Sequence, residues 1–282
     1  MKIYIVIPAH NEEDSIALTL DSLVKQTLLP EKIVVVDDNS TDNTLNIIEE
    51  YSDNFNFIES VAIQSSEAHI PGSKVVNAFN QGLKSLDSNY DIICKFDADL
   101  IFPNNYLETI VGLFNQDEKV GVAGGLPYIE NNGAWKFEAI ASKDHVRGPL
   151  KAYRKQCFED IGGLRPSIGW DSVDVLLAQY AGWKIQTDKT LHVKHLKPTG
   201  ISYHSTSKYL QGEALYKMRS GLILTLIASL KGAFARRSLS FFFNSVSGYF
   251  KAKKQNLEYM VTEDQGNFIR SLRWKNIRKR LF

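Results

Sequence analysis

Short apolar runs rich in β-branched residues alternate with amphipathic stretches along the first part of the chain. Residues 2–8, 33–36, 55–63 and 91–96 have the composition of buried strands. Between and after them, residues 12–26, 42–48, 75–86 and 103–115 have helical spacing or helix-start signals. Strands that alternate with helices predict an α/β protein, with a mostly parallel central sheet covered by helices on both faces.

The pattern becomes less regular after Gly121. We expect residues 133–154 to be irregular or antiparallel, residues 171–181 to form a helix, and residues 183–187 and 191–195 to form short strands. From about Ser205 onward the sequence predicts helices. We therefore expect a first domain over residues 1–204 and a helical C-terminal appendage over residues 205–282. No Pro-rich or Gly-rich linker separates them, so the appendage is expected to pack on the first domain.

Composition excludes several classes of protein. The chain is 44% hydrophobic and 23% charged, which is typical of a globular protein and rules out disorder, collagen and a disulfide scaffold. Cys94 and Cys157 are the only cysteines, which favours a reducing cytoplasm. The apolar run at residues 3–7 is too short for an export signal, and no stretch reaches the roughly 18 apolar residues of a membrane span. The expected location is therefore cytoplasmic.

The net charge of +1 conceals an acidic body and a basic tail. Residues 208–282 hold 15 Lys and Arg against 4 Asp and Glu, so that the tail carries +11 and the rest −10. Apolar tail residues recur at helical spacing between the cations. Two interpretations remain open: helices that pack on the body with a solvated basic face, or an interfacial helix pair on an anionic membrane, and both can hold together. The second would place the protein peripherally on the inner face of the cell membrane. A nucleic-acid partner is not expected, because the body is acidic and no recognition motif is present.

Carboxylates follow three of the predicted strands. Glu12 comes after the first strand, Asp37 and Asp38 end the second, and Asp97 and Asp99 follow the fourth. The carboxyl ends of parallel strands meet at one edge of a sheet, where ligands bind. Carboxylates gathered there would repel one another without a cation, and Mg²⁺ or Mn²⁺ bound to a diphosphate would use one or two of them. Caps and turns are the alternative role for Asp beside a helix start.

Two further polar positions suggest a nucleotide. Residues 39–42 suffice to cap a helix, so the preceding Asp37 and Asp38 supply an additional carboxylate that could accept a hydrogen bond from a nucleobase N–H. Lys74 stands at a predicted helix N-terminus, which attracts anions through its free N–H groups. A solvated surface lysine is the alternative there.

These motifs, taken in order, resemble family 2 glycosyltransferases of the GT-A, Rossmann-like fold. The resemblance is carried by VIPAHNEE at 6–13, VVVDDNSTDNT at 34–44, Lys74, DAD at 97–99, FEDIGGL at 158–164 and GWDSVDVLL at 169–177. It covers about residues 1–200. It implies an inverting transfer of a sugar from a nucleotide-diphosphate sugar, with UDP favoured, to a saccharide or lipid-linked saccharide acceptor.

The resemblance also implies roles for individual residues. Asp38, or its neighbour Asp37, would bind the base, and Pro8, Ala9 and Glu12 would line the nucleotide pocket. Asp99, with Asp97, would hold a divalent metal on the diphosphate, and Lys74 would stabilise the departing nucleoside diphosphate. His195 is a further candidate metal ligand, with an ordinary surface histidine as the alternative.

The acidic catalytic motif departs from the family pattern. The family has Glu-Asp, whereas this chain has Asp171 and Ser172, followed by Asp174. Residues three apart share a helix face, so Asp171 and Asp174 are both candidates for the general base, with Asp171 favoured because it begins the helix. Helix capping is the alternative role for Asp171.

The Gln-x-x-Arg-Trp motif of processive relatives is missing, which favours a single transfer in the assembly of a cell-surface polysaccharide or another glycan. A non-catalytic protein that binds sugar nucleotides or acts as a scaffold remains an alternative, because Ser172 replaces the usual acid. A sugar-phosphate nucleotidyltransferase fits less well, since residues 9–13 are acidic where that class needs a basic, Gly-rich phosphate loop.

Overall fold

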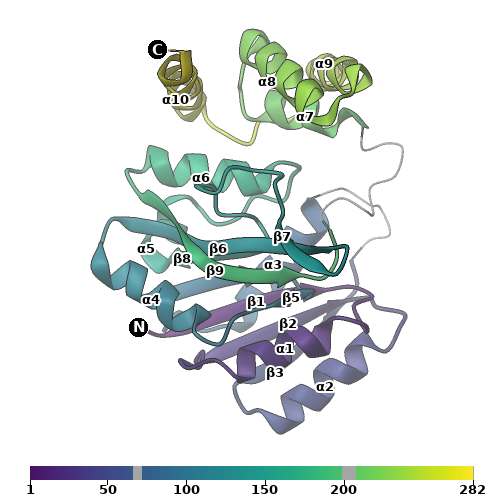
Figure 1. Ribbon diagram of the computed structural model, residues 1–282, viewed down its shortest axis with the longest axis vertical. Helices are drawn as coiled ribbons and strands as arrows, with labels where there is room; N and C mark the ends of the chain where they lie inside the picture. Colours follow the sequence, from purple (N-terminus) through teal and green to yellow (C-terminus); the bar gives the residue numbers. More distant parts are fainter. Residues whose placement is uncertain (66–71, 199–207, 282) are drawn as a thin grey trace. The chain divides into compact units, whose positions relative to one another are not determined.

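The computed structural model describes residues 1–65, 72–198 and 208–281 (Figure 1). Within these residues the chain forms two compact units. The α/β unit takes in the described parts of residues 1–69, 74–164 and 181–201, and the helical unit those of residues 70–73, 165–180 and 202–282. The predicted domain boundary at residues 204–205 lies outside the described residues, and the helical unit includes residues 165–180 as well as the tail.

Four parallel strands form the first half of the sheet in the order β3-β2-β1-β4. Their bounds are Ile3–Ala9 for β1, Lys32–Asp38 for β2, Ile58–Ile63 for β3 and Ile92–Phe96 for β4. Strands β1, β2 and β4 are buried almost throughout, as expected for central strands covered on both faces. The predicted strands agree with these elements to within a few residues.

The helices between these strands cover both faces of the sheet. They are α1 (Ile16–Val24), α2 (Thr44–Asn54) and α3 (Ser73–Ser85). The chain moves from β1 to β3 in one direction and then crosses to β4 on the other side of β1, so right-handed crossovers put α1 and α2 on one face and α3 on the other. Gly82 lets α3 approach closely, because a Cβ there would lie 2.6 Å from both Val6 and Val36. The α/β class with helices on both faces is confirmed.

The second half of the sheet is mixed, so the sheet as a whole is less parallel than the sequence predicts. Strand β8 (Leu150–Arg154) pairs antiparallel with β4 and β6 (Val120–Asn131), and β9 (Lys184–His195) pairs parallel with β6 and antiparallel with β5 (Leu100–Ile101). The two short strands expected at 183–187 and 191–195 are one continuous strand. The helices α4 (Tyr106–Gln116) and α5 (Lys155–Asp160) complete this part of the unit.

A hairpin occupies part of the segment that the sequence left irregular or antiparallel. Strand β7 (Ala134–Phe137) pairs antiparallel with β6, and Asn131 lies opposite Ala134. The two residues between them, Asn132 and Gly133, have φ angles of 53° and 75°. Two successive positive φ angles define a type I′ turn, for which Asn-Gly is the preferred pair.

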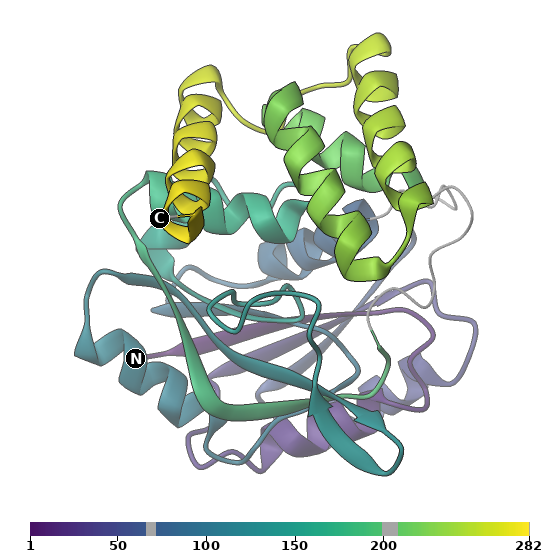
Figure 2. The same cartoon turned by 45° about the horizontal axis from the view of Figure 1, so that its top comes forward.

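The helical unit contains α6 (Trp170–Tyr180), α7 (Leu210–Lys217), α8 (Leu222–Arg236), α9 (Leu239–Lys254) and α10 (Glu263–Leu281). Helices α8 and α9 form a hairpin in which they lie side by side (Figure 2). Arg270 and Arg273 fasten α10 to the turn before α8, by hydrogen bonds of 2.7 Å to the carbonyl of Arg219 and the hydroxyl of Ser220. Across the described part of the chain, no helix has the length and apolar character needed to cross a bilayer.

Candidate functional site

The predicted donor-site residues of the α/β unit lie at the carboxyl ends of β1, β2 and β4. Pro8 and Ala9 end β1 and lie beside Val36 and Asp37 of β2. The loops that follow are joined by hydrogen bonds: the imidazole Nδ1 of His10 lies 2.7 Å from the carbonyl of Asp38. The parallel register of β1 and β2 therefore brings the motifs at 6–13 and 34–44 to one edge of the sheet.

Asp37 and Asp38 have different surroundings, because consecutive strand residues point to opposite faces. Both side chains are buried. The carboxylate of Asp38 accepts hydrogen bonds from the backbone N–H and the hydroxyl of Ser65, at 3.0 and 2.8 Å. One oxygen of Asp37 accepts from the N–H of Ser40 at 3.3 Å, whereas its Oδ1 has no partner among the described residues. Of the two acids, Asp37 therefore has the buried acceptor that lacks a donor among the described residues.

Glu12 lies at the same edge and is held by two neighbours. Lys197 forms an ion pair with its Oε2 at 2.6 Å, and the hydroxyl of Ser15 donates to the same oxygen. Burial raises the pKa of Glu12, the contacts with Lys197 and Ser15 oppose this, and the charge of Asp99 adds to the rise. The charge of Asp99 therefore acts directly on the carboxyl group of Glu12.

The two acids of the DAD motif differ in exposure and in partner. Asp97 is half-buried and pairs with the ammonium group of Lys95, which is fully buried on β4. The Asp99 side chain is buried, and its Oδ2 lies 3.4 Å from Nε2 of His195 at the end of β9. Pairing of β5 with β9, which matches Leu100 with His195, brings these two segments together.

His195 is held from its other side by an acid that sequence reasoning missed. Its Nδ1 donates to Oε2 of Glu138 at 3.2 Å, and Glu138 contacts Arg147 at 3.3 Å, both of them buried. Burial lowers the pKa of His195, but the hydrogen bonds to Asp99 and Glu138 and the charges of Asp99 and Asp97 outweigh it and raise the pKa to about 9. His195 is therefore protonated between two carboxylates at neutral pH.

These residues fit a divalent metal bound jointly with a diphosphate. Over residues 1–65, 72–198 and 208–281 no three His, Cys, Asp or Glu side chains cluster as a closed metal site. Mg²⁺, however, uses one or two protein ligands and takes the rest from phosphate and water, with bonds of about 2.0–2.1 Å, so adjacent ligand atoms lie about 3 Å apart. The separation of Asp99 Oδ2 from His195 Nε2 is close to this. The Glu138–His195 hydrogen bond is the carboxylate–histidine arrangement that orients metal-binding histidines.

Lys74 lies in the first turn of α3 with a half-buried side chain. Asp171 and Asp174 belong to α6 in the helical unit. Asp171 is in the first turn and half-buried, whereas Asp174 is buried and its Oδ1 accepts from the N–H of Val175 at 2.7 Å. The more accessible carboxylate of α6 is therefore that of Asp171.

The model of the glycosyl transferase family 2 matches residues 4–166, which is more than half of the chain. This chain belongs to glycosyl transferase family 2. The match includes the motifs at the ends of β1, β2 and β4, and the resemblance drawn from the sequence is confirmed. Asp171, Asp174 and His195 lie beyond the matched residues.

Curated relatives of this family 2 chain are similar over parts of their length. YdaM, a probable glycosyltransferase of Bacillus subtilis (strain 168), is 31% identical over 220 residues, 69% of this chain and 47% of that protein. The poly-beta-1,6-N-acetyl-D-glucosamine synthase of Staphylococcus aureus (strain MSSA476) is 30% identical over 129 residues, 46% of this chain and 29% of that protein. The family 2 chain thus spans less than half of the length of these relatives.

Solved structures share the fold of this family 2 chain. S. aureus TarS 1–349 in complex with UDP-GlcNAc has a TM-score of 0.59 and 23% identity, covering 80% of this chain and 66% of that one. The mannosyltransferase PcManGT from Pyrobaculum calidifontis, in complex with GDP-Man and Mn²⁺, has a TM-score of 0.59 and 16% identity, covering 100% and 81%. The expected GT-A-like fold is confirmed.

Sequence reasoning did not identify three charged residues around these motifs. Glu138 and Arg147 lie in the segment expected to be irregular or antiparallel, and Lys197 is 185 residues from Glu12. Helical or strand periodicity carries no sign of such contacts. The one available signal was the Asn-Gly pair at 132–133, which predicts a hairpin and would have placed Glu138 just after its second strand.

Proposed function

We propose that this protein transfers a sugar from a nucleotide-diphosphate sugar to a saccharide or lipid-linked saccharide acceptor, with inversion at the anomeric carbon. The observation that carries the proposal is the group of acids and one histidine at the strand ends of the α/β unit: Glu12, Asp37, Asp99 and His195. A carboxylate oxygen without a donor and a carboxylate–histidine pair at the same edge of the sheet suit a nucleoside diphosphate, which offers base N–H groups at one end and phosphates at the other.

In this proposal the base end of the donor is recognised near β2. Oδ1 of Asp37 accepts the nucleobase N–H, while Asp38 holds the loop by its two hydrogen bonds with Ser65. Pro8, Ala9 and Glu12 line the same edge, and the ion pair with Lys197 holds the carboxyl group of Glu12 in place. This division of roles favours Asp37 over Asp38 as the residue that contacts the base.

The phosphate end is placed at Asp99. Asp99 and His195 would hold Mg²⁺ or Mn²⁺, with Asp97 beside them and Glu138 orienting the imidazole. A divalent cation bound there would neutralise charge on the diphosphate, and it would replace the proton on Nε2 of His195. Lys74, at the N-terminus of α3, offers a cation and free N–H groups to the same leaving group.

The proposed base is Asp171, chosen by its position in the family pattern and by its accessibility compared with Asp174. Its carboxylate takes the proton of the acceptor hydroxyl as that oxygen forms a bond to the anomeric carbon. The bond from the anomeric carbon to the diphosphate oxygen breaks on the opposite face, and its electron pair leaves with the nucleoside diphosphate. Because the acceptor oxygen attacks and the diphosphate leaves on opposite faces of the anomeric carbon, the product has the inverted configuration.

A uracil nucleotide is the favoured donor and a single transfer per encounter the favoured mode. Of the solved neighbours, TarS was crystallised with UDP-GlcNAc and with UDP, and PcManGT with GDP-Man and Mn²⁺. The synthase of S. aureus is named for a polymer of N-acetylglucosamine. The name of the synthase supports a role in the assembly of a polysaccharide or another glycan, and we propose that this role is cytoplasmic.

A thermal-shift panel tests the donor site. UDP, GDP, dTDP and CDP are each added with and without Mn²⁺, to the wild type and to Asp99→Ala. Ligand at 100 to 1,000 times Kd stabilises the native state by about 3–4 kcal/mol. We expect a Mn²⁺-dependent rise in melting temperature with one nucleotide, lost in Asp99→Ala. If no nucleotide shifts the wild type, the proposed donor site is wrong.

A further inference from the structure

In the α8–α9 hairpin most of the buried residues are small or polar. They are Thr225, Ser229 and Ala233 on α8 and Ser245, Gly248 and Ala252 on α9, with Leu224 of α8 as the one large apolar residue among them. The hydroxyls of Ser229 and Ser245 are 2.7 Å apart between the helices. Helices in lipid associate through such small residues and interhelical hydrogen bonds.

Nine large apolar side chains of the hairpin are exposed. On α8 Leu222, Ile223, Leu226, Ile227, Leu230 and Phe234 are exposed, and on α9 so are Leu239, Phe243 and Phe250. Ile223 and Phe243 are each 64% exposed, and Phe234 is 76% exposed. They recur at helical spacing, so they form one stripe along α8 and one along α9, and exposed apolar surface of this kind marks an interaction site. We call this set of nine residues the apolar face.

The charge of the hairpin selects the kind of partner. Between Leu222 and Gln255 there are six cations and no acid: Lys231, Arg236, Arg237, Lys251, Lys253 and Lys254. Arg236 and Arg237 lie at the turn between the helices, and three of the lysines lie in the last turn of α9. Cations placed next to exposed apolar residues match an anionic lipid surface, where headgroups and acyl chains adjoin.

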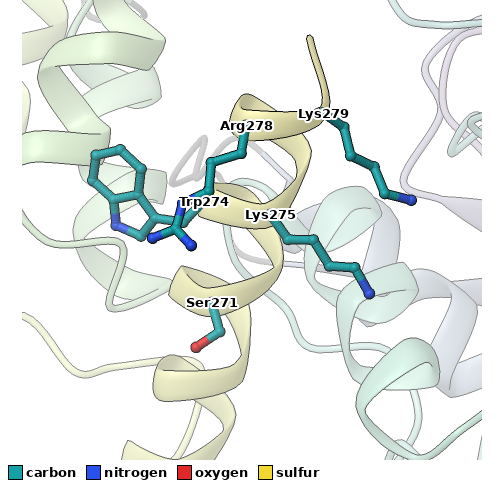
Figure 3. A pocket seen from close by; sticks show the side chains of 5 residues that line it. All are labelled: Ser271, Trp274, Lys275, Arg278 and Lys279. Atoms are coloured by element: carbon teal, nitrogen blue, oxygen red, sulfur yellow. The ribbon is translucent and has the colours of Figure 1, made fainter. Parts of the chain in front are cut away.

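Helix α10 is basic too, but two of its arginines form hydrogen bonds within the helical unit. Arg270 and Arg273 bond to the turn before α8, and burial lowers the pKa of Arg273. Three of its other cations, Lys275, Arg278 and Lys279, form one stripe with Ser271 and Trp274 and line an open hollow beside the helix (Figure 3). This stripe thus offers positive charge with one large aromatic side chain, that of Trp274, while the apolar face belongs to the hairpin.

The length of the hairpin determines how it can meet a bilayer. Helices of 15 and 16 residues are about 22–24 Å long, which is shorter than the roughly 30 Å hydrocarbon core. We propose that the α8–α9 hairpin docks on an anionic membrane and inserts its apolar face into one leaflet without crossing it. This goes beyond the proposed transfer reaction and does not depend on it.

A second copy of the chain is the competing occupant of the apolar face. Two such hairpins facing one another would bring twelve cations together with no acid in either hairpin to neutralise them. An anionic bilayer attracts the same charges. The charge pattern therefore favours lipid over self-association.

Vesicle flotation of the full chain tests the proposal, with phosphatidylcholine vesicles made with and without phosphatidylglycerol at physiological salt. We expect the wild type to float with the anionic vesicles. The triple variant Ile223→Ser, Phe234→Ser, Phe243→Ser should lower the partition coefficient at least about tenfold, since each side chain forfeits its burial in lipid. Lys253→Gln with Lys254→Gln should weaken the preference for phosphatidylglycerol.

Matched controls keep the test specific. Leu29→Ser and Ile140→Ser remove exposed apolar side chains of the α/β unit and should leave flotation unchanged. Phe243→Trp places a reporter on the apolar face, and brominated acyl chains should quench its fluorescence. Circular dichroism of each variant checks that the helices persist.

Three results would overturn the proposal: a wild type that stays out of anionic vesicles, a triple variant that floats as the wild type does, or a wild-type dimer in lipid-free solution that the triple variant dissociates. None of them bears on the nucleotide-dependent thermal shift, so the two proposals fail separately.

Discussion

At the scale of the residue, identical side chains acquire different roles from their partners. Asp37 and Asp38 are neighbours on β2, yet Ser65 occupies both carboxylate oxygens of Asp38, while Oδ1 of Asp37 is buried without a partner among the described residues. A buried acceptor without a partner costs free energy until a ligand supplies the donor. The sequence alone could propose either residue, because the partner Ser65 comes 27 residues later.

Asp37→Ala and Asp38→Ala should therefore have opposite signatures. Asp37→Ala should lower nucleotide affinity about 10–100-fold and change the free energy of unfolding by less than about 1 kcal/mol, since the loss of its long hydrogen bond from Ser40 is offset by removal of the unpaired Oδ1. Asp38→Ala should lower the free energy of unfolding by about 1–3 kcal/mol, because it breaks both bonds to Ser65. Isothermal titration and urea denaturation measure the two quantities. Equal losses of affinity and stability in both variants would contradict the assignment.

At the scale of the element, local pattern predicted the first half of the sheet well and the second half poorly. Strands β1 to β4 have β-branched runs, and the alternating helices determine their parallel order. Strand β6 contains Gly121, Gly124, Gly125 and Pro127, which read as turn signals. The glycines there serve close packing instead: a Cβ on Gly125 would lie 2.6 Å from the carbonyl of Leu191 on β9. Such tertiary contacts are not visible in a local pattern.

The β6–β7 hairpin places Glu138, and its turn depends on Gly133. Gly133 and Gly112 both have open space where a Cβ would go, but Gly133 has a φ of +75°, whereas Gly112 is helical within α4.

 The open space means that an added methyl group meets no neighbour at either site, so only the backbone conformation distinguishes them.

This pair of glycines gives a matched test of the hairpin turn. Gly133→Ala should lower the free energy of unfolding by about 1 kcal/mol, because an L-residue is strained at this positive φ. Gly112→Ala should raise it by about 0.5–1 kcal/mol, because alanine favours the helix. Urea denaturation measures both. Shifts of the same sign in the two variants would show that the turn is not the one described.

At the scale of the whole molecule, the proposed chemistry is divided between the two units. The donor-site residues belong to the α/β unit, and the proposed base Asp171 belongs to the helical unit together with the tail. The sequence predicted a helical C-terminal region and a helix over residues 171–181, which corresponds to α6. It could not assign α6 to the helical unit, because contacts such as the 5.4 Å ring contact between Tyr180 and Phe268 join residues far apart in the chain.

Asp171→Asn should separate binding from chemistry. We expect the variant to keep the Mn²⁺-dependent thermal shift with nucleotide, while its turnover of the donor falls about 10²–10⁴-fold, the usual contribution of a general base. Release of nucleoside diphosphate measures turnover. Asp174→Asn is the comparison, and because Asp174 is buried its main effect should be on stability. If Asp174→Asn abolishes turnover in a folded protein and Asp171→Asn does not, Asp174 is the base.

The central claim is that Asp99 and His195 bind a divalent cation together with a nucleoside diphosphate. The most direct test is titration of Mn²⁺ into the protein with and without the nucleotide chosen by the thermal-shift panel, for the wild type and for Asp99→Ala. Coupling of two ligands is reciprocal, so the nucleotide should tighten Mn²⁺ binding by the same factor as Mn²⁺ tightens the nucleotide. We predict a factor of at least about ten in the wild type, which corresponds to about 1.4 kcal/mol, and none in Asp99→Ala. Mn²⁺ affinity that no nucleoside diphosphate changes would contradict the account.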